Sequence, residues 1–252
     1  MNIASALDQG TDVLHASSPT APLDAELLLA HVLSATESSW LHAHPELQLT
    51  EAQQNHWDTL LAKRAAGVPV SYLIGNAEFY GRSFRVTPDV LIPRPETEDL
   101  VDQALDVIEQ LPSDTPVVAD IGTGSGCIAI TLALANPRIQ LYAIDVSAKA
   151  LAIAEHNAQT HGVADRITFM HGDMFKPIAG KNVDLIVSNP PYVPSAEIDT
   201  AHLRPEAAGL AFEPRLALDG GVSGQLFVNK LKTTGVPAII ETTNGAVVRQ
   251  RC

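Results

Sequence analysis

The architecture of this chain is set by residues 117–135, which read VVADIGTGSGCIAITLALA. Residues 117–121 form an apolar run that predicts a short buried strand, and residues 127–135 form one that predicts a helix. The loop between them has the spacing G-x-G-x-G and consists of Gly122, Thr123, Gly124, Ser125 and Gly126. Strand, glycine loop and helix in this order are typical of nucleotide-binding folds, although a tight strand-to-helix turn has the same pattern.

Two more predicted strands follow, and each ends in polar residues. The strand predicted at residues 139–144 is followed directly by Asp145. This carboxylate lies about 20 residues past the glycine loop, where α/β nucleotide folds place the acceptor for the ribose hydroxyls. Alternatively, Asp145 or Ser147 caps the next helix. Residues 167–170 lead to Asp173 and Met174, which could accept from an adenine amino group and pack on its ring, unless this segment is a plain turn.

A fourth strand, residues 183–188, ends in Asn189-Pro190-Pro191-Tyr192. A nitrogen conjugated to a carbonyl or a ring is a poor nucleophile, so its methylation needs acceptors for its N–H bonds and a partner for the growing positive charge. Asn189 and the Pro190 carbonyl offer acceptors, Pro-Pro stiffens the turn, and the face of Tyr192 can stack on the substrate. Asn-Pro and Pro-Pro also occur in ordinary turns. Because ligands of open α/β sheets bind at the carboxyl ends of strands, four such loops in succession predict a methyl-transfer site.

These motifs resemble those of the PrmC/HemK family of protein-(glutamine-N5) methyltransferases over most of the chain. Residues 120–126 resemble the family's S-adenosylmethionine loop, and residues 189–192 resemble its catalytic tetrapeptide, which adenine methyltransferases share. Two segments are more specific to the family: LIPRPETE at residues 91–98 and FEPRLALDGG at residues 212–221.

The resemblance implies an α/β fold, a Rossmann-like class I S-adenosylmethionine-dependent methyltransferase sheet. It also implies a substrate, the glutamine of the Gly-Gly-Gln motif in peptide-chain release factors, whereas a sister group methylates a ribosomal-protein glutamine. The residues implied to hold S-adenosylmethionine are Gly122, Thr123, Gly124, Ser125, Gly126, Asp145, Asp173, Met174 and Asn189. The residues implied to bind the glutamine amide are Asn189, Pro190, Pro191 and Tyr192, with Asn189, Pro190 and Tyr192 as the catalytic ones. Arg94 and Thr97 are weaker candidates, since Arg94 could equally pair with Glu96 or Glu98.

Composition and charge narrow the function further. The chain has 252 residues, 46% of them hydrophobic, and a formal net charge of -13 without a Lys/Arg run. This charge counts against direct nucleic-acid binding. A nucleic-acid amino-methyltransferase is therefore only the second interpretation, after a methyltransferase that acts on a protein glutamine. Two cysteines, Cys127 and Cys252, are too few for a disulfide scaffold and fit a cytoplasmic location. We expect no signal peptide, no membrane segment and, because His42 and His44 lack an accompanying motif, no metal site. The oligomeric state is not predicted.

Three regions are predicted along the chain. Residues 1–75 read as a helical domain with a capping box at Thr50 and Gln53, either a packing module or, by the resemblance, a substrate-docking domain. Residues 76–96 read as a hairpin and linker, and residues 97–252 as the methyltransferase domain. Residues 236–241 predict a fifth strand, after which residues 242–252 are too few for the helix and antiparallel strand pair that close this sheet in the family. We therefore expect the C-terminal edge strands to be missing, and the third interpretation is a shortened chain that binds without turnover.

Overall fold

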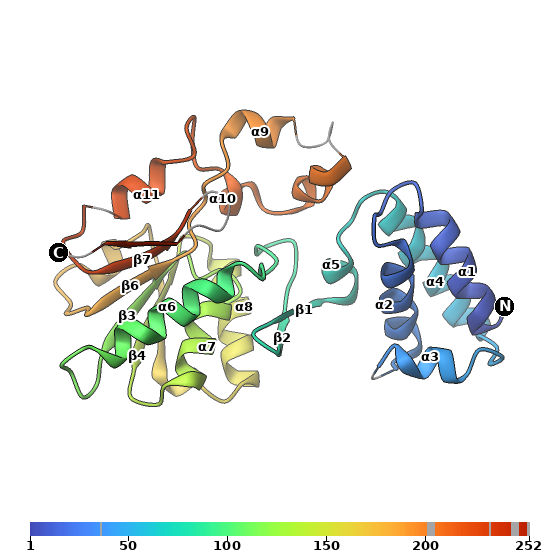
Figure 1. Ribbon diagram of the computed structural model, residues 1–252, viewed down its shortest axis with the longest axis horizontal. Coiled ribbons are helices and arrows are strands. Elements are labelled where there is room, and N and C mark those ends of the chain that lie inside the picture. The colour runs from blue at the N-terminus through green and yellow to red at the C-terminus, as the bar shows by residue number, and fades with distance from the viewer. Residues whose placement is uncertain (36, 201–204, 232, 243–246, 251–252) are drawn as a thin grey trace. The chain divides into compact units, whose positions relative to one another are not determined.

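The computed structural model describes residues 1–35, 37–200, 205–231, 233–242 and 247–250. They divide into two compact units (Figure 1). The first comprises Met1–Gly75 and residues 205–212, and the second comprises residues 76–200 and the described residues from Glu213 onward. Among the described residues, no helix is both long and apolar enough to cross a membrane.

The first unit is helical. Its elements are α1 (Ile3–Leu14), α2 (Ala21–Leu33), α3 (Ser39–Ala43), α4 (Glu51–Ala65), α5 (Val70–Ile74) and the 3-10 helix η4 (Pro205–Phe212). The predicted capping box opens α4, since Gln53 N donates to the Thr50 hydroxyl and Thr50 N donates to the Gln53 side chain. Trp57 of α4 is fully buried in the core that α1, α2 and α4 share.

The second unit begins with a hairpin of β1 (Asn76–Phe79) and β2 (Arg82–Arg85). Tyr80 and Gly81 form its turn, and both have positive φ angles, 54° and 68°. Two successive left-handed residues match the right-handed twist of the flanking strands. The prediction of a hairpin turning at Gly81 is confirmed.

A six-stranded sheet forms the centre of the second unit. Its strands are β3 (Val117–Ile121), β4 (Gln140–Asp145), β5 (Ile167–His171), β6 (Leu185–Ser188), β7 (Ala238–Glu241) and β8 (Val247–Gln250). They lie in the order β5-β4-β3-β6-β7-β8, and β3 to β7 are parallel. The five parallel strands predicted from the sequence are thus confirmed.

The C-terminal edge differs from the prediction. Strand β8 pairs antiparallel with β7, with Val247 opposite Glu241 and Gln250 opposite Ala238. The expectation that the edge strands are missing is therefore wrong for this strand. An antiparallel neighbour can follow directly after a short connection, so the few residues after β7 are enough to supply one. Residues 243–246, 251 and 252, including Cys252, lie outside the described part of the chain.

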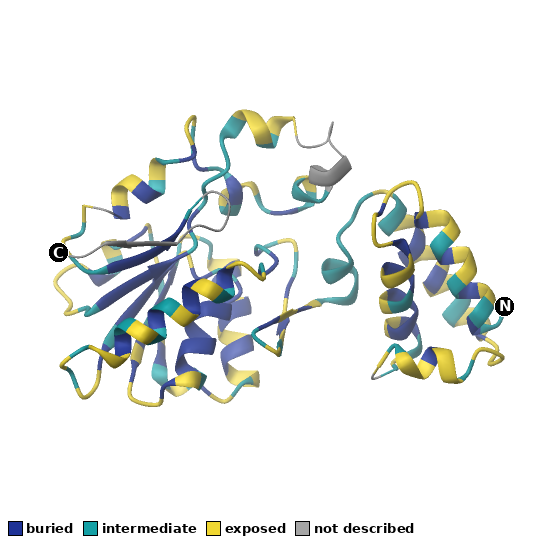
Figure 2. Ribbon diagram, viewed as in Figure 1, coloured by how far each residue is buried: buried dark blue, intermediate teal, exposed yellow. Residues whose placement is uncertain are grey.

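Helices cover both faces of the sheet. The elements that connect the strands are α6 (Thr97–Glu109), α7 (Cys127–Ala135), α8 (Ala148–Thr160), α9 (Ser195–Asp199), α10 (Arg215–Leu218), α11 (Leu226–Leu231), η1 (Ala164–Arg166) and η2 (Lys176–Ile178). Figure 2 shows the central strands β3, β6 and β7 as mostly buried and the outer faces of the helices as exposed.

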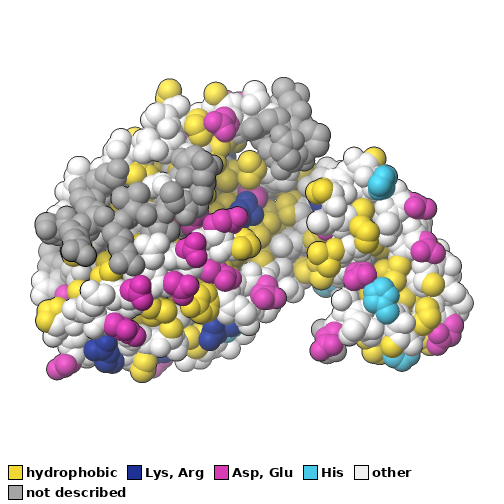
Figure 3. All heavy atoms as spheres, viewed as in Figure 1, with side chains coloured by type: hydrophobic (Ala, Val, Ile, Leu, Met, Phe, Trp, Pro, Cys, Tyr) yellow, Lys and Arg dark blue, Asp and Glu magenta, His cyan; other side chains and the backbone are white. Residues whose placement is uncertain are grey.

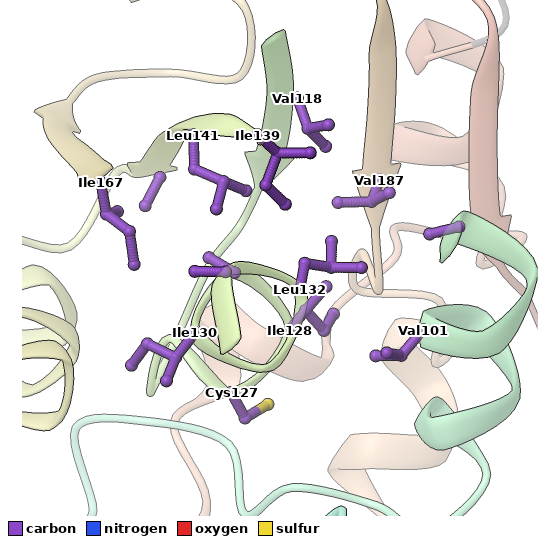
Figure 4. Packing of buried hydrophobic residues seen from close by; sticks show 14 of the residues in the cluster. Val101, Val118, Cys127, Ile128, Ile130, Leu132, Ile139, Leu141, Ile167 and Val187 are labelled. Atoms are coloured by element: carbon purple, nitrogen blue, oxygen red, sulfur yellow. The ribbon is translucent and has the colours of Figure 1, made fainter. Parts of the chain in front are cut away.

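Successive strand residues enter opposite cores because their side chains alternate. Val118 and Val187 pack with α6 and α7, as Figure 4 shows, whereas Ala119 and Ile186 pack in the core that contains α11. A sheet covered on both faces accounts for strands that are apolar throughout rather than alternating in polarity.

Candidate active site

One cavity lies at the carboxyl ends of four adjacent strands, β5, β4, β3 and β6. Each strand contributes the residues that follow it: Ile121 to Ser125, Ile144 to Ser147, Gly172 to Met174, and Ser188 to Pro191. The four loops that the sequence predicted at one sheet edge thus line the same cavity. All lining residues belong to the second unit.

The glycine loop lines this cavity in a conformation that needs glycine. Gly122, Gly124 and Gly126 have φ angles of 76°, 57° and 81°, a region that other residues rarely adopt. A Cβ on Gly122 would meet no atom within 4 Å, so the backbone there faces open space. A Cβ on Gly126 would instead lie 3.1 Å from the Ala154 Cβ, which explains how α7 and α8 pack closely.

Two carboxylates, Asp120 and Asp145, accept hydrogen bonds from the glycine loop. Asp120 is fully buried, and its Oδ2 accepts from the Thr123 hydroxyl at 2.7 Å. Burial raises the pKa of Asp120 to about 7. Asp145 accepts from Gly124 N at 2.9 Å through Oδ2 and from Ser147 N at 2.8 Å through Oδ1.

Asp145 retains the capacity to bind a ligand. Burial raises its pKa, and backbone N–H donors partly offset that shift. Each carboxylate oxygen has more than one lone pair, so both can accept a further hydroxyl. Of the two residues that the sequence offered as the cap of the next helix, Ser147 is the one that caps it. Its hydroxyl accepts from Ala150 N at the start of α8.

Asp173 and Met174 line the cavity in contrasting ways. Asp173 is largely exposed, and its carboxylate pairs with Lys176 at 2.7 Å, which lowers its pKa. Met174 is buried and adopts a φ of 51°, an unusual conformation for a residue with a side chain. Strained backbone of this kind is often found at ligand sites.

The tetrapeptide follows β6, and three of its residues, Asn189, Pro190 and Pro191, line the cavity. The Asn189 amide donates through Nδ2 to the Thr97 hydroxyl at 3.0 Å. Tyr192 does not line the cavity; it is half-buried and donates its hydroxyl to Glu241 at 3.1 Å. The structure therefore brings Asn189 to the glycine loop and turns the Tyr192 hydroxyl toward β7.

The segment after residue 212 holds the tetrapeptide in place. Val193 N donates to Leu218 O at 2.9 Å, and Gly220 N donates to Val193 O at 2.9 Å. A Cβ on Gly224 would lie 2.3 Å from the Tyr192 carbonyl oxygen. Only glycine allows this close approach, so the two glycine-containing turns fix the backbone just after residues 189–192.

Arg94 pairs with Glu213, not with Glu96 or Glu98 as considered from the sequence. Glu213 is buried and also accepts from Ile92 N at 3.3 Å. Its side chain joins the two family-specific segments, residues 91–98 and 212–221, although more than a hundred residues separate them in the chain. Glu98 has another role, since it accepts from Tyr80 N at 2.7 Å.

Three polar residues near the site were not identified from the sequence: Glu213, Glu241 and Asn157. Glu241 could have been identified from the sequence, because it ends an apolar strand at the same sheet edge as Asp145. Asn157 is buried in α8 and connects β2 to the glycine loop by bonding Arg85 and Ser125. No local pattern distinguishes it from other helical asparagines.

Cys127, His42 and His44 have structural rather than chemical roles in this chain. Cys127 is buried, as predicted for a small core residue, and burial raises the pKa of its thiol to about 12. His42 contacts Glu26, and His44 contacts the Trp40 carbonyl. Within the described residues, no group of three or more potential metal ligands gathers.

Comparison with known proteins places this chain in a family. Residues 97–205 match the Methyltransferase small domain, and residues 5–75 match the PrmC N-terminal domain. The catalytic domain of human Mettl16, solved with an RNA hairpin, superposes with a TM-score of 0.52 at 15% identity, over 86% of this chain and 79% of that chain. At this identity the likeness concerns the fold alone. It agrees with the predicted class I S-adenosylmethionine-dependent methyltransferase fold, which is confirmed.

Sequence relatives are much closer. The release factor glutamine methyltransferase of Moorella thermoacetica is 41% identical over 225 residues, 89% of this chain and 77% of that protein. The protein of the same name from Koribacter versatilis is 40% identical over 234 residues, 92% of this chain and 80% of that protein. The chain therefore belongs to the family of release factor glutamine methyltransferases.

Proposed function

We propose that this protein transfers a methyl group from S-adenosylmethionine to the side-chain amide nitrogen of a glutamine in a peptide-chain release factor. The observation that carries the proposal is the placement of Asn189. Its side chain lies in the wall of the cavity that the glycine loop lines, and its Nδ2 is already bound to Thr97. Its Oδ1 is thereby left to accept from a substrate N–H.

The cavity residues fit S-adenosylmethionine. The glycine loop presents backbone beside open space, Asp145 has lone pairs for ribose hydroxyls, and Met174 offers an apolar surface for the adenine ring. We propose that Asp173, an exposed residue of the cavity lining, accepts from the adenine amino group. When bound, S-adenosylmethionine supplies a methyl group on a positively charged sulfur.

The substrate amide would be held by the tetrapeptide. Asn189 Oδ1 and the Pro190 carbonyl accept its two N–H bonds, which turns the nitrogen toward the methyl group. These acceptors would also stabilise the positive charge that grows on the nitrogen during transfer, and one N–H proton would then pass to solvent water. Holding two partners in line accounts for a large part of such a rate enhancement, on the order of 7–11 kcal/mol.

Tyr192 lies outside the cavity lining, next to Pro191, and we propose that its ring packs against the substrate amide as the amide enters the site. Its hydroxyl is fixed by Glu241, so the ring has little freedom to rotate away. Burial, with the Glu241 carboxylate close by, raises the pKa of Tyr192 to about 12, so the phenol remains neutral. A neutral aromatic face attracts nearby positive charge.

Charge favours a protein substrate over a nucleic acid. Figure 3 shows acidic side chains gathered over α6, whose exposed residues include Asp99, Asp102, Asp106 and Glu109. Helix α6 begins at Thr97, a lining residue of the cavity. Such a surface repels phosphates and attracts basic proteins. We further propose that the helical unit, Met1–Gly75, docks the release factor and that the protein acts in the cytoplasm.

A direct assay tests the function. The purified chain is incubated with S-adenosylmethionine and a release factor, the intact mass of the factor is measured, and any added methyl group is mapped. We expect one methyl on the glutamine of the Gly-Gly-Gln motif. We expect Asn189→Ala to abolish transfer while titration calorimetry still detects S-adenosylmethionine binding. Asn229→Ala, on the exposed side of α11, is the matched control.

Two results would contradict the proposal. Methylation at another position, or of a ribosomal protein in preference to the release factor, would overturn the substrate. Near-normal turnover by Asn189→Ala would overturn the role of the tetrapeptide.

A further inference from the structure

Arg94 is the one residue with a positively charged side chain among the described residues that line the cavity. Its Nη2 pairs with Glu213, whose side chain is 3% exposed, while the Arg94 side chain is 30% exposed. Glu213 also accepts from Ile92 N, so this carboxylate is held by two donors and fixes the guanidinium in place. The ion pair as a whole adds no net charge to the cavity wall.

The ion pair leaves part of the arginine unused. A guanidinium carries several N–H donors in a planar fork, and within the described residues only Nη2 of Arg94 has a hydrogen-bond partner. A lysine would supply the same charge to Glu213 through a single nitrogen, so the pairing alone does not require arginine. Nε and Nη1 are therefore available to an acceptor that a ligand brings into the cavity.

Arg94 lies at the end of the cavity that the tetrapeptide forms. Thr97 N donates to the Arg94 carbonyl at 3.1 Å, and the Thr97 hydroxyl accepts from Asn189 Nδ2 at 3.0 Å. All three residues line the cavity. A substrate glutamine whose amide reaches Asn189 has its main chain only the length of one side chain away, which is within reach of an arginine on this turn.

A substrate segment needs donors as well as acceptors. Asn189 Oδ1 and the Pro190 carbonyl are acceptors, and they satisfy the N–H bonds of the glutamine amide. The segment that carries this glutamine also has main-chain carbonyl groups, and a carbonyl that is buried without a donor costs free energy. Because Glu213 already compensates the charge of Arg94, the remaining N–H groups suit a neutral carbonyl better than a second carboxylate, which would leave a negative charge uncompensated.

We propose that Arg94 is a substrate-recognition residue, whose guanidinium donates to the main-chain carbonyl of the residue that precedes the target glutamine. The inference rests on the proposed function for the identity of the substrate, and it adds how the segment around the glutamine is bound. A contact to the main chain orients this segment without depending on the side chains next to the glutamine.

The first test measures binding and turnover separately. Arg94→Lys keeps a positive charge beside Glu213 but removes the donors of the planar fork. We expect this variant to bind a release factor about tenfold more weakly in the presence of S-adenosylhomocysteine, which is the loss expected for one hydrogen bond from a charged donor. KM for the factor should rise by a similar amount, whereas kcat and the dissociation constant for S-adenosylmethionine should not change.

The second test alters the carbonyl instead of the arginine. A release factor is prepared with an ester in place of the peptide bond between the target glutamine and the residue before it, because an ester carbonyl is a weaker acceptor. We expect the wild-type protein to bind this factor more weakly than the natural one, and Arg94→Lys to bind both equally, since the two changes remove the same contact. Losses that multiply in full would overturn the proposal. Undiminished binding of the ester by the wild-type protein would do so even if Arg94→Lys did not fold.

Arg166→Lys is the matched control. Arg166 is also half-buried and donates through Nη1 to the Asn136 carbonyl at 3.3 Å, but it directly precedes β5, at the sheet edge opposite the cavity. This variant should bind the factor and the cofactor as the wild type does. Weaker binding of S-adenosylmethionine by Arg94→Lys would assign the arginine to the cofactor and overturn the proposal.

The outcomes separate recognition from function. If the wild-type protein methylates a release factor and Arg94→Lys binds that factor normally, the recognition role is refuted and the function stands. If the wild-type protein binds the factor more tightly than Arg94→Lys does, yet transfers no methyl group, the proposed function fails and the recognition role stands. A wild-type protein that neither binds nor methylates the factor refutes both.

Discussion

Replacing Asn157 with alanine tests whether the hairpin and the glycine loop are held together by one side chain. Asn157 Oδ1 accepts from Arg85 N at 2.9 Å, and its Nδ2 donates to Arg85 O at 3.0 Å and to Ser125 O at 2.8 Å. The side chain is 2% exposed, so water does not readily replace it. Alanine removes all three hydrogen bonds at once.

The magnitude follows from the number and burial of these bonds. Each hydrogen bond contributes about 1 kcal/mol to folding, and a buried group left without a partner costs about 1–3 kcal/mol. Arg85 is exposed, so water can replace its lost bonds in the variant, whereas Ser125 is buried. We therefore expect the free energy of unfolding of the second unit to fall by about 2–4 kcal/mol. In a domain of this size, that corresponds to a decrease in Tm of roughly 5–15 °C.

The assay is thermal unfolding by circular dichroism, with and without S-adenosylmethionine. Ser125 belongs to the glycine loop, so the variant should also bind S-adenosylmethionine more weakly and gain less Tm from it than the wild type does. Gln159→Ala, two residues later on the exposed side of α8, is the control and should change stability by less than about 0.5 kcal/mol. If Asn157→Ala is as stable as Gln159→Ala and binds the cofactor normally, the reasoning is refuted.

Two further predictions concern the tetrapeptide and the buried acid beneath the glycine loop. Gly224→Ala would place a Cβ 2.3 Å from the Tyr192 carbonyl oxygen, at a residue whose φ is 70°. We therefore expect the free energy of unfolding to fall by more than about 2 kcal/mol and kcat to decrease. Unaltered unfolding of the variant would contradict this contact. The pKa of Asp120 is raised from 3.8 to about 7 in the folded state, so the unfolded state loses its proton first, and stability is lost as pH rises from about 4 to 7. Asp120→Asn should therefore gain stability relative to the wild type at pH 8, on the order of a few kcal/mol, and little at pH 4; an equal difference at both pH values would rule out this titration.

The parts predicted well from the sequence are those that depend on neighbouring residues. Strand β3 and helix α7 have the same bounds as their apolar runs in the sequence, because the glycine loop separates the two runs clearly. The capping box at Thr50 and the turn at Gly81 are equally local, since each involves residues no more than three apart. Strand β6 begins two residues later than its apolar run, at Leu185. Asp184 accounts for part of this, because its side chain accepts from Val117 N instead of extending the strand.

The parts missed from the sequence depend on residues far apart in the chain. Tyr192 and Glu241 are 49 residues apart, Arg85 and Asn157 are 72 apart, and Ile92 and Glu213 are 121 apart. No periodicity or spacing reports such a contact. The strand β8 was missed for a different reason, since the expected closing elements were longer than the four residues that the edge requires.

The acidic residues around the cavity have one role in common, which is to accept hydrogen bonds that hold a loop in place. Asp120, Asp145, Glu213 and Glu241 are buried or nearly so, and each holds a different loop: the first two hold the glycine loop, Glu213 holds residues 92–94, and Glu241 holds Tyr192. Buried carboxylates add little to stability, and apolar residues of similar volume often replace them without loss. They do offer acceptors at fixed points, which apolar side chains cannot. A site that acts by holding two reactants in line needs such fixed points more than it needs added stability. Amide substitutions at these acids should therefore impair methyl transfer more than they impair folding.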